Sequence, residues 1–150
     1  MLTRRGLLIS ASGVVLAGLA TAHRAQAARP SVKLYKNPGC ECCDGYADYL
    51  RRHGFTVTST ETAELAEISR KAGVPTELQG CHTSLIGDQV VEGHVPIEAI
   101  EKLLAEKPRI KGIALAGMPT GSPGMSGDKI GPFTIHAIGM DGETSVYMTV

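Results

Sequence analysis

The stretch NPGCECCDGYADYL, residues 37–50, decides the fold. It follows an alternating strand predicted over 32–35 and begins a helix predicted over 41–53. Cys40 and Cys43 form a C-x-x-C pair at the point where the strand turns into the helix. Exposed amide groups and the helix dipole at such a point favour a thiolate over a thiol. The stretch therefore predicts a sulfur site at a strand–helix junction, suited to redox chemistry or to metal binding.

Cys42, which lies between the two, helps to separate these chemistries. Disulfide exchange needs one attacking and one resolving sulfur, and a third thiol between them invites mispairing. A soft metal ion, in contrast, gains from an additional thiolate. Structural disulfides are disfavoured, because Cys42 and Cys43 are adjacent and a Cys40–Cys43 bridge closes a very small loop that constrains little of the unfolded chain. The spacing favours metal ligation.

Hydrophobic periodicity and turn residues along the rest of the chain predict the order β-α-β-α-β-β-α. This is the order of the thioredoxin and glutaredoxin architecture, an α/β fold with a mixed sheet and flanking helices. Two more strands after Pro108 form a predicted C-terminal β extension. The remaining predicted elements are strand 55–59, helix 61–72, a hairpin of strands 83–86 and 89–91, helix 97–106, and strands 133–138 and 145–150.

Cys81-His82 is the second thiol-bearing motif. When GCHTSLIGDQVVEGH, residues 80–94, is aligned by pattern with a glutaredoxin, His82 takes the place of the cis-proline that faces the C-x-x-C pair. This register predicts that Cys81 lies against the three cysteines of the helix start. In a competing register Pro75 takes that place, and Cys81 then lies about 15–20 Å away at roughly 3.3 Å per residue. We favour the first register because it explains the hairpin and the glycine spacing together.

Four other side chains are candidate metal ligands. His82 is contiguous with Cys81, and His94 follows a glycine turn close to the site in the favoured register. Met118 and Met125 stand in a loop rich in proline and glycine, either as exposed soft ligands or as a cap on an apolar patch. Copper(I) accepts thiolate and thioether ligands and is the predicted metal. Zinc is the alternative, because four thiolates also form a structural-zinc arrangement.

The first 27 residues read as an export signal. Arg4-Arg5 forms a twin-arginine pattern, an apolar run follows over about 7–22, and Ala25-Gln26-Ala27 is a small-residue cleavage site. We therefore expect one thioredoxin-like domain, residues 28–150, in the periplasm, with no membrane span in the mature form. Its net charge is about −3 and it is poor in aromatic residues, so nucleic acid is not an expected partner.

Three motifs resemble a known family, the exported CopG-like metal-binding proteins, described as a domain of unknown function. They are NPGCECC, GVPTELQGCHTSLIGDQVVEGHVP and GMPTGSPGM, and the similarity spans Val32 to about Val146. The resemblance implies a thioredoxin-like fold, copper handling in the bacterial periplasm and an association with metal resistance. It also implies four cysteine ligands, to which the two histidines and two methionines are plausible additions: Cys40, Cys42, Cys43, Cys81, His82, His94, Met118 and Met125.

Three functional hypotheses follow. The first is a periplasmic copper-binding protein that sequesters Cu(I), transfers it to another periplasmic copper protein, or cycles it between oxidation states. The second is a thiol–disulfide oxidoreductase that uses Cys40 and Cys43. The third is a structural zinc or disulfide module that presents the methionine loop to a partner. Whether the chain is an enzyme stays open at this stage.

Overall fold

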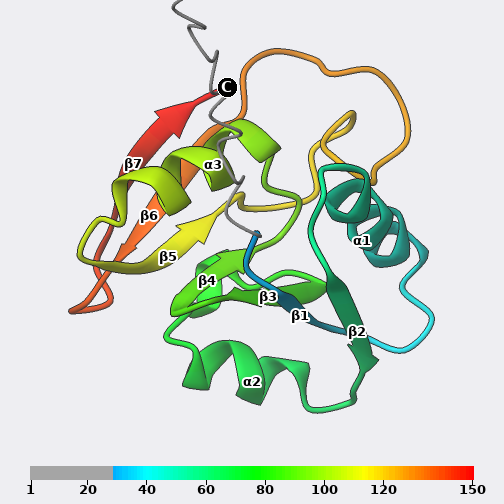
Figure 1. The fold of residues 1–150 in the computed structure, drawn as a ribbon, viewed down its shortest axis with the longest axis horizontal. Helices are drawn as coiled ribbons and strands as arrows, with labels where there is room; N and C mark the ends of the chain where they lie inside the picture. Colours follow the sequence, from blue (N-terminus) through cyan, green and yellow to red (C-terminus); the bar gives the residue numbers. More distant parts are fainter. Residues whose placement is uncertain (1–28) are drawn as a thin grey trace, which may run out of the picture.

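The computed structural model describes residues 29–150 (Figure 1). The predicted export signal, residues 1–27, lies outside them. Within residues 29–150, no helix has both the length and the apolar character that a membrane span requires. The elements are β1 (Val32–Lys36), α1 (Glu41–Arg52), β2 (Val57–Glu61), α2 (Leu65–Lys71), a 3-10 helix η1 (Thr76–Leu78), β3 (His82–Ile86), β4 (Gln89–Glu92), α3 (Ile97–Glu106), β5 (Ile110–Ala114), β6 (Thr134–Gly139) and β7 (Thr144–Thr149).

The strands form a single seven-stranded mixed sheet in the order β2-β1-β3-β4-β5-β6-β7. Its first four strands have the thioredoxin-like arrangement, in which β1 pairs parallel with β2 and antiparallel with β3, and β3 pairs antiparallel with β4. The predicted thioredoxin-like fold is thus confirmed. The predicted extension is also present: β5 pairs parallel with β4, and β6 and β7 follow in antiparallel pairing.

Helices cover both faces of the sheet. Figure 1 shows α1 and α3 on one side and α2 on the other. The larger apolar cluster lies under α1 and α3 and includes Leu50, Ile100 and Ile113. The smaller one lies on the α2 side and includes Val90 and Ile138. Burial on two faces fixes the register of the inner strands, because a slip of one residue would exchange the two sets of side chains.

One predicted element has the wrong start, and one strand was missed. Helix 61–72 begins only at Leu65, because Glu61 continues β2 and the amide of Glu64 donates a hydrogen bond to the Thr62 hydroxyl, 3.0 Å away, in a turn before the helix. Strand β5 was not predicted. It has Gly112 at its centre, where a Cβ atom would overlap the carbonyl oxygen of Val90 in the neighbouring strand. A short strand with a central glycine lacks the alternation that indicates a strand.

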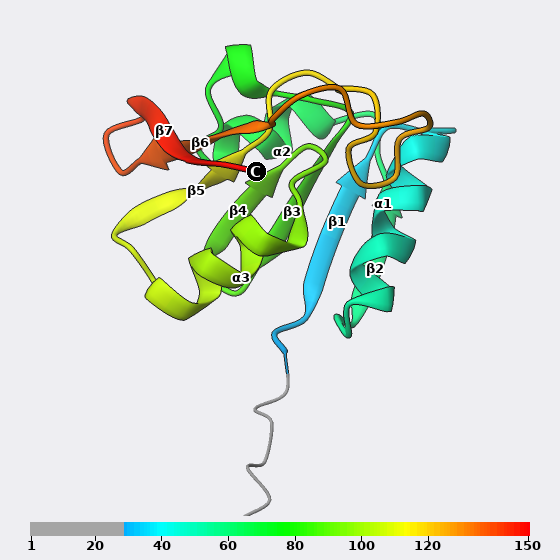
Figure 2. The ribbon, with the colours of Figure 1, turned by 90° about the horizontal axis from the view of Figure 1, so that it is seen from above.

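The fold brings four segments to one end of the sheet. These are the turn between β1 and α1, the segment before β3, the segment after β4, and the long loop 115–133 between β5 and β6. Figure 2 shows that this loop passes over the start of α1. All eight predicted ligands lie in these segments or at the adjoining ends of helices and strands.

Candidate metal centre

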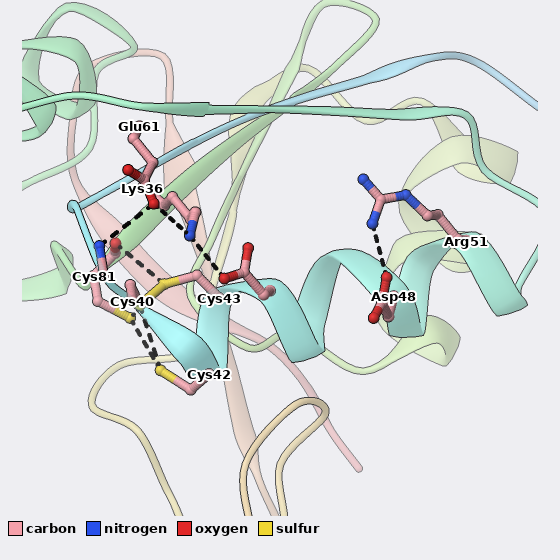
Figure 3. Close-up of polar contacts among 10 residues, drawn as sticks. Lys36, Cys40, Cys42, Cys43, Asp48, Arg51, Glu61 and Cys81 are labelled. Carbon is pink, nitrogen blue, oxygen red and sulfur yellow. Dashed lines mark hydrogen bonds and ion pairs between the residues drawn. A yellow bond between two sulfur atoms is a disulfide. The ribbon is translucent and has the colours of Figure 1, made fainter.

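The first three cysteines come from the start of α1. Cys40 is the N-cap residue, Cys42 is half-buried and Cys43 is fully buried. Cys40 and Cys43 are one turn apart and form a disulfide, with 5.4 Å between their Cα atoms. The Sγ atom of Cys42 lies 3.5 Å from that of Cys40. Figure 3 shows the three sulfur-bearing side chains gathered around the helix start.

This disulfide differs from the expectation of four metal-binding thiolates. Cysteines at positions i and i+3 of a helix start have a Cα separation inside the range that a disulfide requires, so the bridge forms although its loop is small. A second bridge is absent from residues 29–150, where Cys42 and Cys81 are free thiols. Reduction of the single bridge is sufficient to give four thiols.

Cys81 lies against the other three cysteines. Its Sγ atom is 3.3 Å from that of Cys43 and 3.8 Å from that of Cys42. The pairing of β1 with β3 produces this proximity, because it places Lys36 opposite His82 and continues with a hydrogen bond from the Asn37 amide to the Cys81 carbonyl, 3.2 Å long.

The favoured register is therefore confirmed and the Pro75 register is wrong. Pro75 precedes the 3-10 helix η1 and not a strand, so Cys81 is not carried away from the helix start. His82 is the first residue of β3, in the position predicted for the cis-proline, and the described part of the chain has no cis peptide bond. The four sulfur atoms lie within 4.8 Å of one another.

Both predicted histidines also reach Cys81. The Nδ1 atom of His82 and the Nε2 atom of His94 each lie 3.8 Å from its sulfur. The other ring nitrogens face backbone carbonyl oxygens: His82 Nε2 lies 3.1 Å from Gly93 O, and His94 Nδ1 lies 2.7 Å from Pro123 O. A carbonyl oxygen only accepts, so these nitrogens carry the protons, and each ring presents a free lone pair to Cys81. This is the orientation that metal-binding histidines usually have.

The histidine rings are buried and uncharged. His82 and His94 are both fully inaccessible to solvent, and the ring of Tyr46 lies 4.7 Å and 5.4 Å from theirs. Burial and the neighbouring His94 lower the pKa of His82 to about 3, and burial lowers the pKa of His94. Burial and the neighbouring Cys42 raise the pKa of the Cys81 thiol to about 12. The site thus holds neutral groups, and a metal ion that binds Cys81 near neutral pH displaces its proton.

One buried cation lies beside the sulfur atoms. Lys36 is only 4% exposed, and its Nζ atom lies 2.8 Å from a carboxylate oxygen of Asp44 and 3.0 Å from one of Glu61 (Figure 3). Asp44 stands in the first turn of α1, where a carboxylate complements the helix dipole, and it also pairs with Lys36. This pair of contacts ties the first turn of α1 to strands β1 and β2.

The methionines are placed differently from the other predicted ligands. Met118 is 51% exposed. Met125 is half-buried and follows Gly124, whose backbone packs against the first turn of α1 beside the carbonyl of Cys42. The same loop supplies the Pro123 carbonyl to His94. It brings Met125, which follows Gly124, to the edge of the site.

Glu92 is a buried residue of the site that sequence reasoning missed. It is fully inaccessible, and its carboxylate accepts hydrogen bonds from the Gly80 amide and the Thr83 hydroxyl, each 2.7 Å long. It thereby fixes the residue before Cys81. Nothing in the sequence indicates that a glutamate at the end of a strand, next to a glycine, is buried. The two backbone carbonyls that orient the histidines could not be predicted from the sequence either.

Comparisons with known proteins agree with this site. The family described as "Protein of unknown function, DUF411" matches residues 78–125, which contain Cys81, both histidines and both methionines. Two solved structures named copper resistance protein copG, forms 1 and 2, are similar to this chain. Each is 33% identical, has a TM-score of 0.75, and covers 81% of this chain and 98% of its own length. No curated protein sequence matches.

Proposed function

Since the chain belongs to the family of the copper resistance protein CopG, we propose that it binds Cu(I) through its cysteine cluster in the periplasm. The single observation that carries the proposal is the convergence of four sulfur atoms within 4.8 Å, drawn from two distant parts of the chain. Thiolates at this density suit a soft monovalent ion better than they suit hard cations.

The ligand set that we propose has an inner and an outer part. Cys40, Cys42, Cys43 and Cys81 supply thiolates after a two-electron thiol reductant has opened the disulfide, and they lose their protons when the metal binds. His82 and His94 offer neutral nitrogen donors to an ion held by Cys81.

The outer part of the set is the methionine loop. Met125 lies at the edge of the site, and Met118 is exposed in the same loop, as suits thioethers that pass copper to or from a second periplasmic copper protein. Sequestration, transfer and redox cycling of copper are the forms of activity that this proposal covers. The twin-arginine pattern supports export of a chain that has already folded, which suits a protein with a thiol or metal site.

An anaerobic Cu(I) titration of the reduced mature protein against a competing chelator tests the proposal. We expect tight uptake of at least one copper ion per chain, and loss of that uptake in the double variant Cys40→Ser/Cys43→Ser. Met125→Leu should weaken uptake, whereas Met140→Leu, an exposed methionine in the turn between β6 and β7, is the matched control and should not. Unchanged stoichiometry in the double variant would refute the assignment of these ligands.

A second candidate function rests on the disulfide itself. A Cys40–Cys43 bridge at a helix start is also the arrangement of a thiol–disulfide oxidoreductase. Turnover of insulin or of glutathione disulfide by the metal-free protein tests this function directly. Metal analysis of the purified protein tests the remaining alternative, because a structural zinc site would retain zinc and take up no copper.

A further inference from the structure

The contact between Cys81 and the Cys40–Cys43 disulfide indicates a reaction that does not depend on copper. We propose that Cys81 attacks Cys43 within the folded protein, so that the disulfide moves from the Cys40–Cys43 pair to the Cys43–Cys81 pair. The site thus holds a mobile disulfide, and the position of the bridge decides which sulfur donors are free.

Distances between the sulfur atoms identify the attacking thiol. Cys81 Sγ lies 3.3 Å from Cys43 Sγ, which is the shortest contact of a free thiol with the bridge. Cys42 Sγ lies 3.5 Å from Cys40 Sγ, but a Cys40–Cys42 bond would close a ring with one residue between the cysteines. Cys81 belongs to a different segment of the sheet and closes no such ring. It is the thiol that is placed for exchange.

The step is balanced without any external reagent. The Cys81 S–H bond breaks, a bond between Cys43 and Cys81 forms, and the Cys40–Cys43 bond breaks, so that Cys40 leaves as a thiolate. The proton that Cys81 gives up ends on Cys40, so the step has no net change in protons. His94 Nε2 and His82 Nδ1 face Cys81 at 3.8 Å, where either lone pair can accept a hydrogen bond from the thiol before the step. One disulfide and two thiols are present before and after the step.

The leaving group has a favourable place. Cys40 is the N-cap residue of α1, where unpaired amide groups and the helix dipole stabilise a thiolate. The Cys43 sulfur, which takes part in both bonds, stays buried between the other two. The exchange therefore changes the partner of Cys43 from Cys40 to Cys81, and the buried Cys43 sulfur stays in place.

Each position of the bridge leaves a different set of donors. With Cys40–Cys43 bridged, Cys81 remains free and lies within 4.8 Å of the ligand atoms of His82 and His94. With Cys43–Cys81 bridged, Cys40 and Cys42 are the free pair at the start of α1. The oxidised protein thus offers a half-buried thiol beside two buried histidines or a half-buried pair of thiols.

The variant Cys42→Ser makes the exchange observable, because it leaves three cysteines and therefore one free thiol per oxidised chain. The metal-free variant, held with a chelator, is oxidised with one equivalent of diamide. Its disulfide isomers are then separated at acid pH, where exchange stops, and identified by peptide mapping. Each isolated isomer is returned to neutral pH. Acid-quenched wild-type protein is mapped in the same way.

We expect both isomers, Cys40–Cys43 and Cys43–Cys81, and each isolated isomer should return to the same mixture. The return should be at least about tenfold faster in buffer than in concentrated urea, since the fold holds the reacting sulfur atoms together. The variant Cys42→Ser/Cys81→Ser is the control and should retain only the Cys40–Cys43 bridge. A single isomer in both the variant and the wild type, or isomers that do not interconvert, would overturn the proposal. Failure of the copper titration would leave it unaffected.

Discussion

Glu92 stands at one end of a chain of buried hydrogen bonds. Thr83 Oγ1 lies 2.7 Å from the carboxylate and 2.6 Å from Ser69 Oγ, which in turn lies 3.0 Å from the carbonyl oxygen of Leu65. The Thr83 hydroxyl donates to the carboxylate, and the Ser69 hydroxyl donates to the Leu65 carbonyl. Burial raises the pKa of Glu92 to about 7 and outweighs the hydrogen bonds from Gly80 and Thr83, which lower that pKa.

A glutamine at this position should therefore stabilise the protein at alkaline pH. The raised pKa means that the folded state binds more protons than the unfolded state, so wild-type stability falls as the pH rises from about 4.5 to about 7. Glu92→Gln removes this cost. We expect the unfolding free energy of the variant, measured relative to wild type, to be up to about 3 kcal/mol higher at pH 8 than at pH 5.

Urea unfolding of both proteins at the two pH values measures this difference. Glu77→Gln, which changes an exposed glutamate of η1, is the control and should show no gain with pH. An equal effect of Glu92→Gln at pH 5 and pH 8 would show that the carboxyl is not held in its neutral form by the fold.

His94 offers a direct test of the nitrogen ligands. His94→Gln removes the lone pair that faces Cys81, and we expect the Cu(I) dissociation constant to rise by about tenfold or more. His53→Gln is the matched control, because His53 caps the far end of α1. The copper–sulfur absorption bands should change only in the first variant. Equal affinities and spectra in both variants would remove His94 from the ligand set.

Loop 115–133 depends on close backbone contact with helix α1. Gly124 has a φ of 83°, and a Cβ atom there would press on the Tyr46 amide and the Cys42 carbonyl. Gly117 also has a positive φ, 71°, but nothing lies within 4 Å of the Cβ position. A comparison of alanine substitutions at the two glycines therefore separates the effect of backbone strain from the effect of losing the contact between the loop and the helix.

We expect Gly124→Ala to lower the unfolding free energy by about 1–3 kcal/mol more than Gly117→Ala does, because only the first also pushes the loop from the helix. It should also weaken copper uptake, since the loop carries Met125 and the carbonyl that orients His94. Thermal unfolding and the copper titration, run on both variants, measure the two effects. Equal losses in both variants would mean that the loop does not support the site.

The elements differ in how much of them the sequence could predict. Helix α3 was predicted with its observed bounds, 97–106, because proline opens it and its apolar positions have helical spacing. The contact of Cys81 with the other cysteines could be predicted once the register with His82 in the cis-proline position was chosen over the register with Pro75 there. In contrast, β5 is held by its neighbours on both sides and not by its own pattern, and the disulfide depends on a Cα separation that spacing alone does not give. Such features depend on tertiary contacts.

The C-terminal extension contributes to both apolar clusters of the molecule. Strand β6 contributes Ile135 to the cluster under α1 and α3, and Ile138 to the cluster on the α2 side. We expect Ile135→Ala and Ile138→Ala each to reduce the unfolding free energy by about 2–5 kcal/mol, as in other buried cores. Val146→Ala, on the edge strand β7 and 64% exposed, is the control with little expected effect. Denaturant unfolding measures all three, and a separate transition for the extension would contradict this view.

The positions of the four cysteines in the sequence have a consequence for the order in which a newly made chain folds and forms disulfides. Cys40, Cys42 and Cys43 are neighbours in any conformation of the chain, whereas Cys81 joins them only after β3 has paired with β1. In a chain that is oxidised while still extended, proximity favours only bridges among the cysteines of residues 40–43. A bridge that includes Cys81 shows that β3 had already paired with β1 when it formed. In a newly made chain, the first disulfide to form therefore shows whether folding or oxidation came first.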